Sequence, residues 1–308
     1  MIAAALVAVA AALPLAGTTI HVDAGHNGAN GSHPAQINRQ VPAGTGGYRK
    51  ACDTTGAQTN DGRLTEATFN LDVARRLQRR LARLGARVVM TRTTNDGVGP
   101  CVNERAAIGN RAHADLALSI HADGGPPGGR GFHVIAPLAD RAVRPAIVAP
   151  SRRFARALRA RLEGIGLPRS SYIGEGAGLV QRADLGGLNL SRVPKAFVEL
   201  GNMRNAADAR LLERASQRDL FAVALARAVV AALRPGGTSA GAAAYFSRIS
   251  TMSSAPSGGS TCRRRTSALT DLGTSRISRP RFVWPLPIVP AEKASGSGIW
   301  SYCLSPLP

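Results

Sequence analysis

Short apolar segments alternate along the chain with longer segments of helical periodicity. The predicted strands are 18–23, 86–92, 115–121, 131–136 and 196–200, and the predicted helices are 66–84, 103–112, 151–165 and one or two within 207–233. The clearest helix, 66–84, has Thr65 as a fair N-cap and Gly85 as a fair C′ residue. Its apolar positions recur at spacings of three and four residues: Phe69, Val73, Leu77, Leu81 and Leu84. This alternation predicts an α/β fold whose largely parallel central sheet is covered by helices on both faces.

Composition changes at Arg234, where a Pro-Gly pair follows and no apolar period is sustained afterwards. We therefore expect residues 18–235 to form one domain and residues 236–308 to be a low-complexity, disordered tail. The long polar segment 26–61 is rich in Gly, Asn and Thr, and a loop of this length is usually functional or partly ordered by a hairpin of its own. Residues 27–65 and 172–190 are expected to flank a ligand-binding groove.

Residues 1–16 are apolar and carry no charge. The run is shorter than the roughly 20 residues that a membrane-spanning helix needs, so we expect no stable membrane span. It resembles the apolar region of a secretory signal, with small residues near a possible cleavage point around Ala16 or Gly17, although the usual positive N-terminal region is missing. The alternative is a buried N-terminal helix. The first interpretation predicts a secreted protein of the periplasm or cell-wall space.

The chain of 308 residues has a formal net charge of +20, which suggests an anionic environment such as nucleic acid, a membrane or an acidic cell-wall polymer. The basic residues lie mostly on the polar faces of predicted helices, as in 74–87 and 151–162. They do not form one dense block with interleaved aromatic residues. We therefore favour solvated helix faces and expect no specific nucleic-acid partner.

Four residues could carry chemistry: His26, Glu66, His121 and Glu199. His26 follows one predicted strand and His121 ends another, and ligands of α/β proteins gather beyond the carboxyl ends of the strands. Two imidazoles and a carboxylate can hold zinc with one position open to water, and a further carboxylate can take the proton of that water. Two alternatives stay open: Glu66 could only favour the dipole of its helix, and Glu199 could pair with an arginine.

Two of the four cysteines, Cys52 and Cys101, lie in predicted loops within the domain. Because export permits disulfides, we predict that these two residues pair with each other. The alternative is two free thiols. A zinc site made by cysteines is disfavoured, since no two cysteines are closely spaced.

The order and context of these residues resemble the zinc-dependent N-acetylmuramoyl-L-alanine amidases, the type 3 amidase family. DAGHNG at 23–28 resembles the family's D-P-G-H-G-G turn, and SIHAD at 119–123 is similar to S-I-H-A-N. Glu66 looks like the family's second metal ligand. VELG at 198–201 is similar to the closing E-x-G segment, although the usual aromatic residue after the glycine is absent. The resemblance covers about 18–233 and is greatest to small, single-domain secreted members with a disulfide-tied loop near the site.

The resemblance implies one Zn²⁺ per chain, with His26, Glu66 and His121 as metal ligands and Glu199 as the catalytic base. The bond cut would be the amide between N-acetylmuramic acid and L-alanine in peptidoglycan, so the expected partners are peptidoglycan fragments or muropeptides. We expect a monomer. Two rival functions stay open at this point: a zinc peptidase of other specificity, and a non-catalytic, zinc-containing cell-wall binding protein.

Overall fold

A six-stranded sheet forms the centre of the computed structural model, which describes residues 13–140 and 143–234. The strand order is β4-β1-β5-β8-β6-β7. The strands are β1 (Thr19–Ala24), β4 (Arg87–Met90), β5 (Leu116–Asp123), β6 (His133–Pro137), β7 (Leu179–Arg182) and β8 (Lys195–Asn202). Neighbouring strands from β4 to β8 are parallel, while β6 is antiparallel to β8 and parallel to β7. The predicted α/β fold with a mostly parallel sheet is confirmed.

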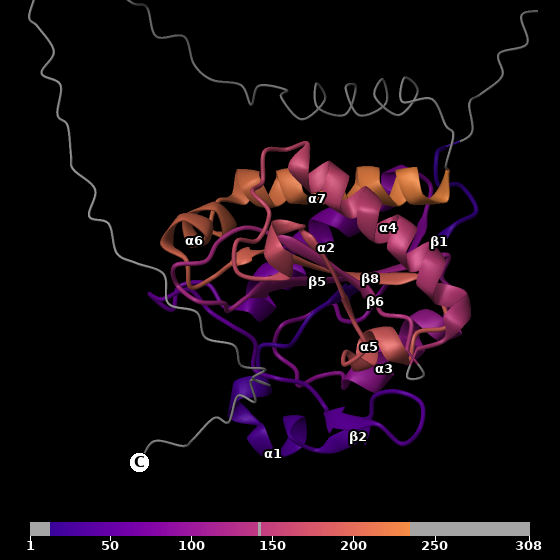
Figure 1. Ribbon diagram of the computed structural model, residues 1–308, viewed down its shortest axis with the longest axis horizontal. Coiled ribbons are helices and arrows are strands. Elements are labelled where there is room, and N and C mark those ends of the chain that lie inside the picture. Colours follow the sequence, from indigo (N-terminus) through magenta and orange to yellow (C-terminus); the bar gives the residue numbers. More distant parts are fainter. Residues whose placement is uncertain (1–12, 141–142, 235–308) are drawn as a thin grey trace, which may run out of the picture. The chain divides into compact units, whose positions relative to one another are not determined.

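Helices lie on both sides of this sheet (Figure 1). The long helices α2, α4 and α7 pack together on one side, and the shorter helices α3 and α5 lie on the other. The helices are α1 (Pro34–Ile37), α2 (Glu66–Arg83), α3 (Val102–Arg111), α4 (Pro145–Glu163), α5 (Gly186–Asn189), α6 (Ala206–Leu212) and α7 (Ala215–Leu233). Two single turns of 3-10 helix, Asn30–Ser32 and Gly174–Gly176, complete the elements. The segment 207–233 therefore contains two helices, α6 and α7, separated by a short turn.

Helix α2 has nearly the predicted bounds, because its N-cap, the glycine that follows it and its apolar face all indicate the same segment. The Thr65 hydroxyl accepts a hydrogen bond from the Thr68 amide at 3.3 Å, which satisfies one of the free N–H groups of the first turn. After the helix, Gly85 has a φ of +95°, a conformation that favours glycine at this position. Leu77 and Leu81 are fully buried against the sheet and α7. Burying each such side chain contributes about 1.5–3 kcal/mol to folding.

The end of the apolar N-terminal segment is part of the core. Leu15 is fully buried, and its amide donates to the Leu84 carbonyl at 2.8 Å, so it packs on the C-terminal end of α2. Cleavage around Ala16 or Gly17 stays a prediction, and it would remove this buried side chain. Residues 1–12 lie outside the described residues. Among the helices that the structure describes, none is both long and apolar enough to cross a bilayer.

Two segments differ from the sequence-based expectation. Helix α4 begins at Pro145 rather than at 151 and contains Pro150. A proline inside a helical pattern usually marks the end of a helix. Here the first turns of α4 bury Ile147 and Val148, and this packing offsets the backbone hydrogen bond that Pro150 cannot form. The segment 172–190 contains β7 and α5, which lack a strong periodic signal of their own.

The long segment after β1 is ordered by a hairpin and a disulfide. Strands β2 (Gln40–Pro42) and β3 (Arg49–Ala51) pair antiparallel, as a loop of this length led us to expect. Cys52 follows β3 directly and bonds to Cys101, the N-cap residue of α3. The predicted pairing is confirmed.

Removing this disulfide is expected to lower the free energy of unfolding by about 2–4 kcal/mol, because the bond closes a large loop in the unfolded chain. The two cysteines are 49 positions apart in the sequence. Urea unfolding of wild type and of Cys52→Ala/Cys101→Ala would measure the difference. An unchanged midpoint would contradict the expectation.

A cluster of buried polar side chains lies between the sheet and α3. His21 is fully buried on β1 beside Gly109 of α3, and its Nε2 contacts the Thr91 hydroxyl at 2.9 Å. Burial, together with the positive charges of Lys195 and Arg105, lowers the pKa of His21 from 6.5 to about 4, although the negative charge of nearby Asp23 opposes the shift. The folded protein therefore holds His21 neutral.

Stability should consequently fall as the pH drops from about 6.5 to about 4, because the unfolded chain binds a proton at His21 in this window and the folded chain does not. The loss is up to about 3 kcal/mol for this imidazole. Unfolding midpoints of chelator-treated protein, measured against pH for wild type and His21→Gln, would test it. The variant should show the shallower decline, and identical slopes would contradict the assignment.

Candidate metal centre

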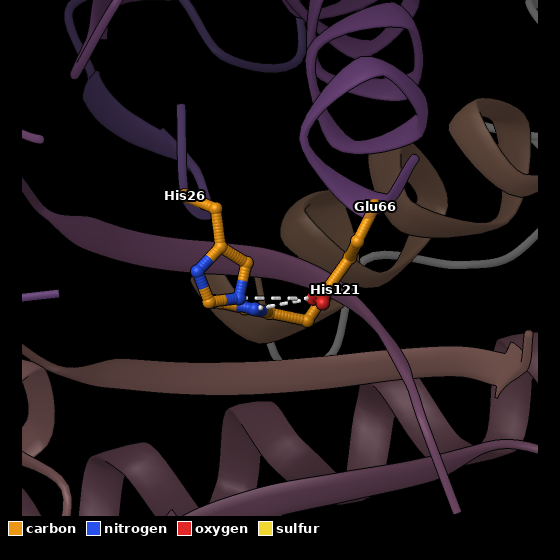
Figure 2. Close-up of side chains that lie close together, drawn as sticks. All are labelled: His26, Glu66 and His121. Atoms are coloured by element: carbon orange, nitrogen blue, oxygen red, sulfur yellow. Dashed lines mark hydrogen bonds and ion pairs between the residues drawn. The ribbon is translucent and has the colours of Figure 1, made fainter. Parts of the chain in front are cut away.

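Three side chains from separate parts of the chain meet beyond the carboxyl ends of β1 and β5. His26 follows β1, Glu66 opens α2, and His121 lies on β5 (Figure 2). Glu66 Oε1 is 3.3 Å from His26 Nε2 and 2.9 Å from His121 Nδ1, and one ligand atom from each residue lies within 4.8 Å of the other two. Their side chains are 12%, 6% and 13% exposed, in the same order. The three residues therefore face one another in a largely enclosed space.

His26 is held in an uncommon backbone conformation. Its φ is +55°, which is rarely adopted by residues other than glycine. Two buried arginines fix the carbonyls on either side of this φ: Arg92 Nη2 donates to Gly25 O at 3.1 Å, and Arg105 Nη2 donates to His26 O at 2.9 Å. A non-glycine residue persists in this region only where its surroundings determine it, and such residues cluster at functional sites.

Gly25 lets the two histidines approach each other. A Cβ atom at this position would lie 2.1 Å from Cε1 of His121, so any side chain here would displace the ring. The glycine beside His26 is therefore required by close packing against the second histidine.

Glu66 is fixed by backbone donors from two other segments. Its Oε2 accepts from the Ala57 amide at 2.8 Å, and its Oε1 accepts from the Ala122 amide at 3.3 Å. Glu66 therefore does more than favour the dipole of its helix, because its carboxylate contacts the two histidines.

The electrostatics of this cluster favour a cation. Burial alone would lower the pKa of His26, but the carboxylates of Glu66 and Asp53 raise it to about 10. Burial would raise the pKa of Glu66, but the adjacent rings of His26 and His121 lower it well below its usual value. Two imidazole nitrogens and one carboxylate oxygen are a donor set that divalent transition metals bind. The residues present are consistent with a metal ion.

Glu199 of β8 lines the same pocket, a cavity of about 430 Å³ that also includes Gly56, Asp123, Gly124 and Arg204. Its Oε2 is buried and has no hydrogen-bond partner within the described part of the chain. Loss of contact with bulk water raises the pKa of Glu199 well above its usual value, and the negative charges of Glu66 and Asp123 raise it further. Within residues 13–140 and 143–234, no arginine forms an ion pair with it, so the alternative interpretation of Glu199 is not what the structure contains.

Comparison with known proteins decides the family. The model of the N-acetylmuramoyl-L-alanine amidase family matches residues 20–231, more than half of the chain. The chain belongs to this family. The amidase is 44% identical over 226 residues to the N-acetylmuramoyl-L-alanine amidase Rv3717 of Mycobacterium tuberculosis, a match that covers 72% of this chain and 89% of that protein.

Solved structures agree with this assignment. The crystal structure of the amidase Ami1 from Mycobacterium smegmatis is 42% identical with a TM-score of 0.66, and the match covers 71% of this chain and 98% of that one. The apo form of Ami1 from Mycobacterium abscessus is 43% identical with the same TM-score, and the match covers 71% of this chain and 100% of that one. The resemblance inferred from the sequence motifs is confirmed, and with it the activity of an N-acetylmuramoyl-L-alanine amidase on peptidoglycan.

The remaining histidines of the amidase lie outside the cluster. His21 and His133 are buried within strands, His33 is exposed near α1, and His113 follows α3. The residues that support this cluster have no clear signal in the sequence. Asp53 contacts His26 Nδ1 at 3.1 Å, and its only sequence signal was its position next to Cys52. Lys195 lies just before the predicted strand 196–200, and it is among the largest fully buried side chains.

Proposed function

We propose that this amidase holds a single zinc ion through His26, Glu66 and His121, and that Glu199 is its catalytic base. The observation that carries the proposal is the convergence of three donor atoms, from α2, from β5 and from the residues after β1, in one pocket with Oε2 of Glu199, which has no hydrogen-bond partner among the described residues. The set of two imidazoles and one carboxylate is that of catalytic zinc sites, which leave one position open.

When bound there, zinc would supply Lewis acidity, which polarises a carbonyl group and makes water a better nucleophile. Glu199 would accept the proton of the attacking water and pass it to the leaving amine of L-alanine. Its Oε2 is free for this purpose, since no described residue occupies it. A divalent cation beside the carboxyl group would also favour its ionised form.

We further propose that the protein works outside the cytoplasm, in the periplasm or cell-wall space, where peptidoglycan is found. The Cys52–Cys101 disulfide supports this location, because structural disulfides persist in oxidising compartments. The excess of basic residues suits an anionic polymer as surroundings.

Metal analysis by mass spectrometry, paired with a digest of purified muropeptides and of a panel of simple peptides, tests the proposal. We expect about one zinc per chain. We also expect release of stem peptide from the muropeptides and no cleavage of the simple peptides. Cleavage of the simple peptides with the muropeptides intact would favour a zinc peptidase of other specificity. Zinc without cleavage of either would favour a cell-wall binding protein.

The catalytic domain is proposed to end near Arg234, because α7 ends at Leu233 and the family match ends at 231. Residues 236–308, expected to be disordered, lie outside the described residues. Truncation after Arg234 should leave zinc content and muropeptide hydrolysis within about 2-fold of the full chain, since the core and pocket residues that the structure describes all precede this point. A larger loss of either quantity would place the domain boundary further along the chain.

A further inference from the structure

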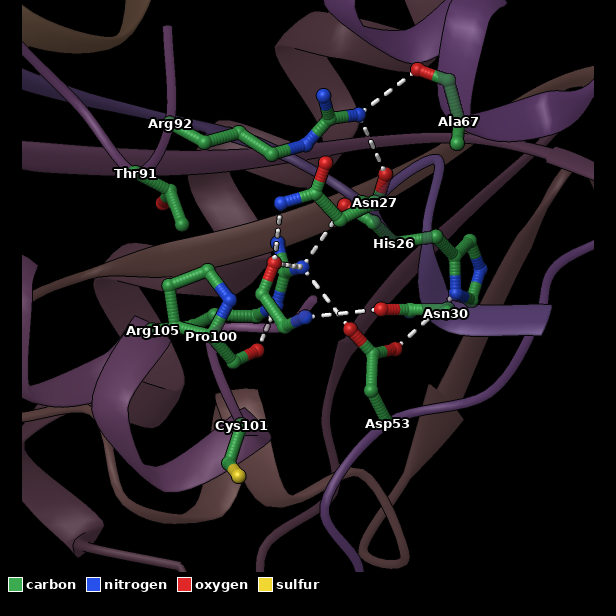
Figure 3. A network of polar contacts seen from close by, with 12 residues as sticks. His26, Asn27, Asn30, Asp53, Ala67, Thr91, Arg92, Pro100, Cys101 and Arg105 are labelled. Carbon is green, nitrogen blue, oxygen red and sulfur yellow. Dashed lines mark hydrogen bonds and ion pairs between the residues drawn. The ribbon is translucent and has the colours of Figure 1, made fainter. Parts of the chain in front are cut away.

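We propose that Arg105 is a positioning residue that orients both histidine ligands through two carboxylates, Asp53 and Asp23, and that the Cys52–Cys101 disulfide holds this arrangement together. The inference rests on the metal site of the proposed function. It concerns residues that do not touch the ion, and Figure 3 shows the network around Arg105.

The first connection runs from Asp53 to His26. His26 turns Nε2 toward Glu66, and its opposite nitrogen, Nδ1, lies 3.1 Å from Asp53 Oδ1. The Thr54 carbonyl lies at the same distance from Nδ1. A histidine that binds a metal through one nitrogen usually donates its other N–H to a carboxylate or carbonyl, which fixes the ring and raises its basicity. Asp53 is placed for this role.

The second connection runs from Asp23 to His121 through a hydroxyl group. His121 turns Nδ1 toward Glu66, and its Nε2 lies 3.2 Å from the Ser119 hydroxyl. Ser119 in turn donates to Asp23 Oδ2 at 2.9 Å. Ser119 and His121 lie on the same side of β5, two residues apart, so the strand itself sets this geometry.

Arg105 joins the two carboxylates. Its Nη1 donates to Asp23 Oδ1 at 2.9 Å and its Nη2 to Asp53 Oδ2 at 3.0 Å, and the side chain is only 5% exposed. The other donors of the guanidinium reach the carbonyls of Ala24, His26 and Pro100. All three nitrogens are therefore engaged in one fixed fork, an arrangement that the single ammonium group of a lysine cannot reproduce.

The disulfide connects the two backbone segments that carry Asp53 and Arg105. Cys52 precedes Asp53, and Cys101 is the N-cap residue of α3, one helical turn before Arg105. The Val102 amide also donates to the Cys52 carbonyl at 2.8 Å. Loss of the disulfide would leave this backbone hydrogen bond to hold the 52–53 segment at the start of α3, so that Asp53 would be held less firmly against Arg105.

The experiment measures the zinc dissociation constant by chelator competition for Asp53→Asn, Ser119→Ala and Arg105→Lys. Asp53→Asn keeps the size of the side chain but removes its charge, and Ser119→Ala breaks the link to Asp23. We expect each to raise the dissociation constant about 10- to 100-fold, the effect that partners of metal-binding histidines usually have. The absorption spectrum of the Co²⁺-loaded protein should change as well, because the orientation of the rings sets the ligand field.

Two controls separate positioning from a general loss of stability. Leu158→Ala opens a cavity in the buried face of α4 and destabilises the fold without touching the network. Asp184→Asn removes an exposed carboxylate that pairs with Arg182. Both should keep the wild-type dissociation constant. A rise in Leu158→Ala as large as that in Asp53→Asn would overturn the proposal, and so would a dissociation constant of Asp53→Asn within about 2-fold of wild type.

Cys52→Ala/Cys101→Ala tests the disulfide without adding a thiol that binds zinc. We expect a raised dissociation constant, and a smaller effect of Asp53→Asn in this background than in wild type, because the two changes act on the same contact. Additive effects would remove the disulfide from the proposal. None of these measurements depends on hydrolysis, so wild type that binds zinc but cleaves no muropeptide would contradict the proposed function alone. Wild type that binds no zinc would overturn both.

Discussion

Replacing Glu199 with alanine is expected to lower the rate of muropeptide hydrolysis by about 10²- to 10⁴-fold, the usual contribution of a positioned general acid or base. The physical reason is that Oε2 of Glu199 is a buried carboxylate oxygen of the pocket without a hydrogen-bond partner among the described residues, whereas both oxygens of Glu66 already accept hydrogen bonds. Zinc content should stay near one per chain, because Glu199 is not among the three grouped ligands. Rate and metal content are measured on the same preparation.

Glu213→Ala is the matched control, since this glutamate lies at the C-terminal end of α6 and does not line the pocket. It should hydrolyse muropeptides at the wild-type rate. Glu199→Ala that retains full activity would exclude Glu199 as the base. Loss of zinc together with activity would instead make Glu199 a ligand.

Replacing Asp23 with alanine is expected to lower the free energy of unfolding by about 3–5 kcal/mol, because it leaves two buried positive charges without their partner. Lys195 Nζ lies 3.0 Å from Asp23 Oδ2 and Arg105 Nη1 lies 2.9 Å from Oδ1, and both Asp23 and Lys195 are only 1% exposed. Burial would raise the pKa of Asp23, but these two cations hold it well below its usual value. Urea unfolding of the variant and of wild type gives the difference.

Two further variants make this prediction specific. Asp23→Ala/Lys195→Met should be more stable than Asp23→Ala alone, since it removes one of the two buried positive charges that have lost their partner. Asp72→Asn breaks a surface ion pair with Arg76 and Arg218 and should cost at most about 1 kcal/mol. An Asp23→Ala variant no less stable than Asp72→Asn would show that the buried cations find other partners.

Much of the fold followed from local patterns. Helix α2 was predicted to within one residue because Thr65, Gly85 and the apolar face all agree. Helix α4 and strand β7 were harder to predict, because they depend on packing. Pro150 stands inside α4 against its usual tendency, and β7 is bounded by contacts with β6. Local propensity cannot report such long-range contributions.

The candidate site likewise contains residues that the sequence indicated and residues that only the structure reveals. His26, His121 and Glu199 were found because each lies at the end of an apolar strand, where the chain order of an α/β fold brings ligands to one edge of the sheet. The disulfide partners were found because only two cysteines lie in the domain. The supporting residues were not found as such: Asp53, Arg105 and Lys195 carry no periodic signal that distinguishes them from surface charges.

The sequence by itself determined the long helices, five of the six strands of the central sheet, the identity of the chemical groups and the family. These depend on residue type and spacing along the chain. The tertiary structure alone decided which nitrogen of each histidine faces Glu66, which carboxylate supports which ring, and that one buried guanidinium joins both. Those contacts connect residues up to 96 positions apart, as between Ser119 and Asp23. Their geometry exists only after the sheet has assembled and excluded water from the charges.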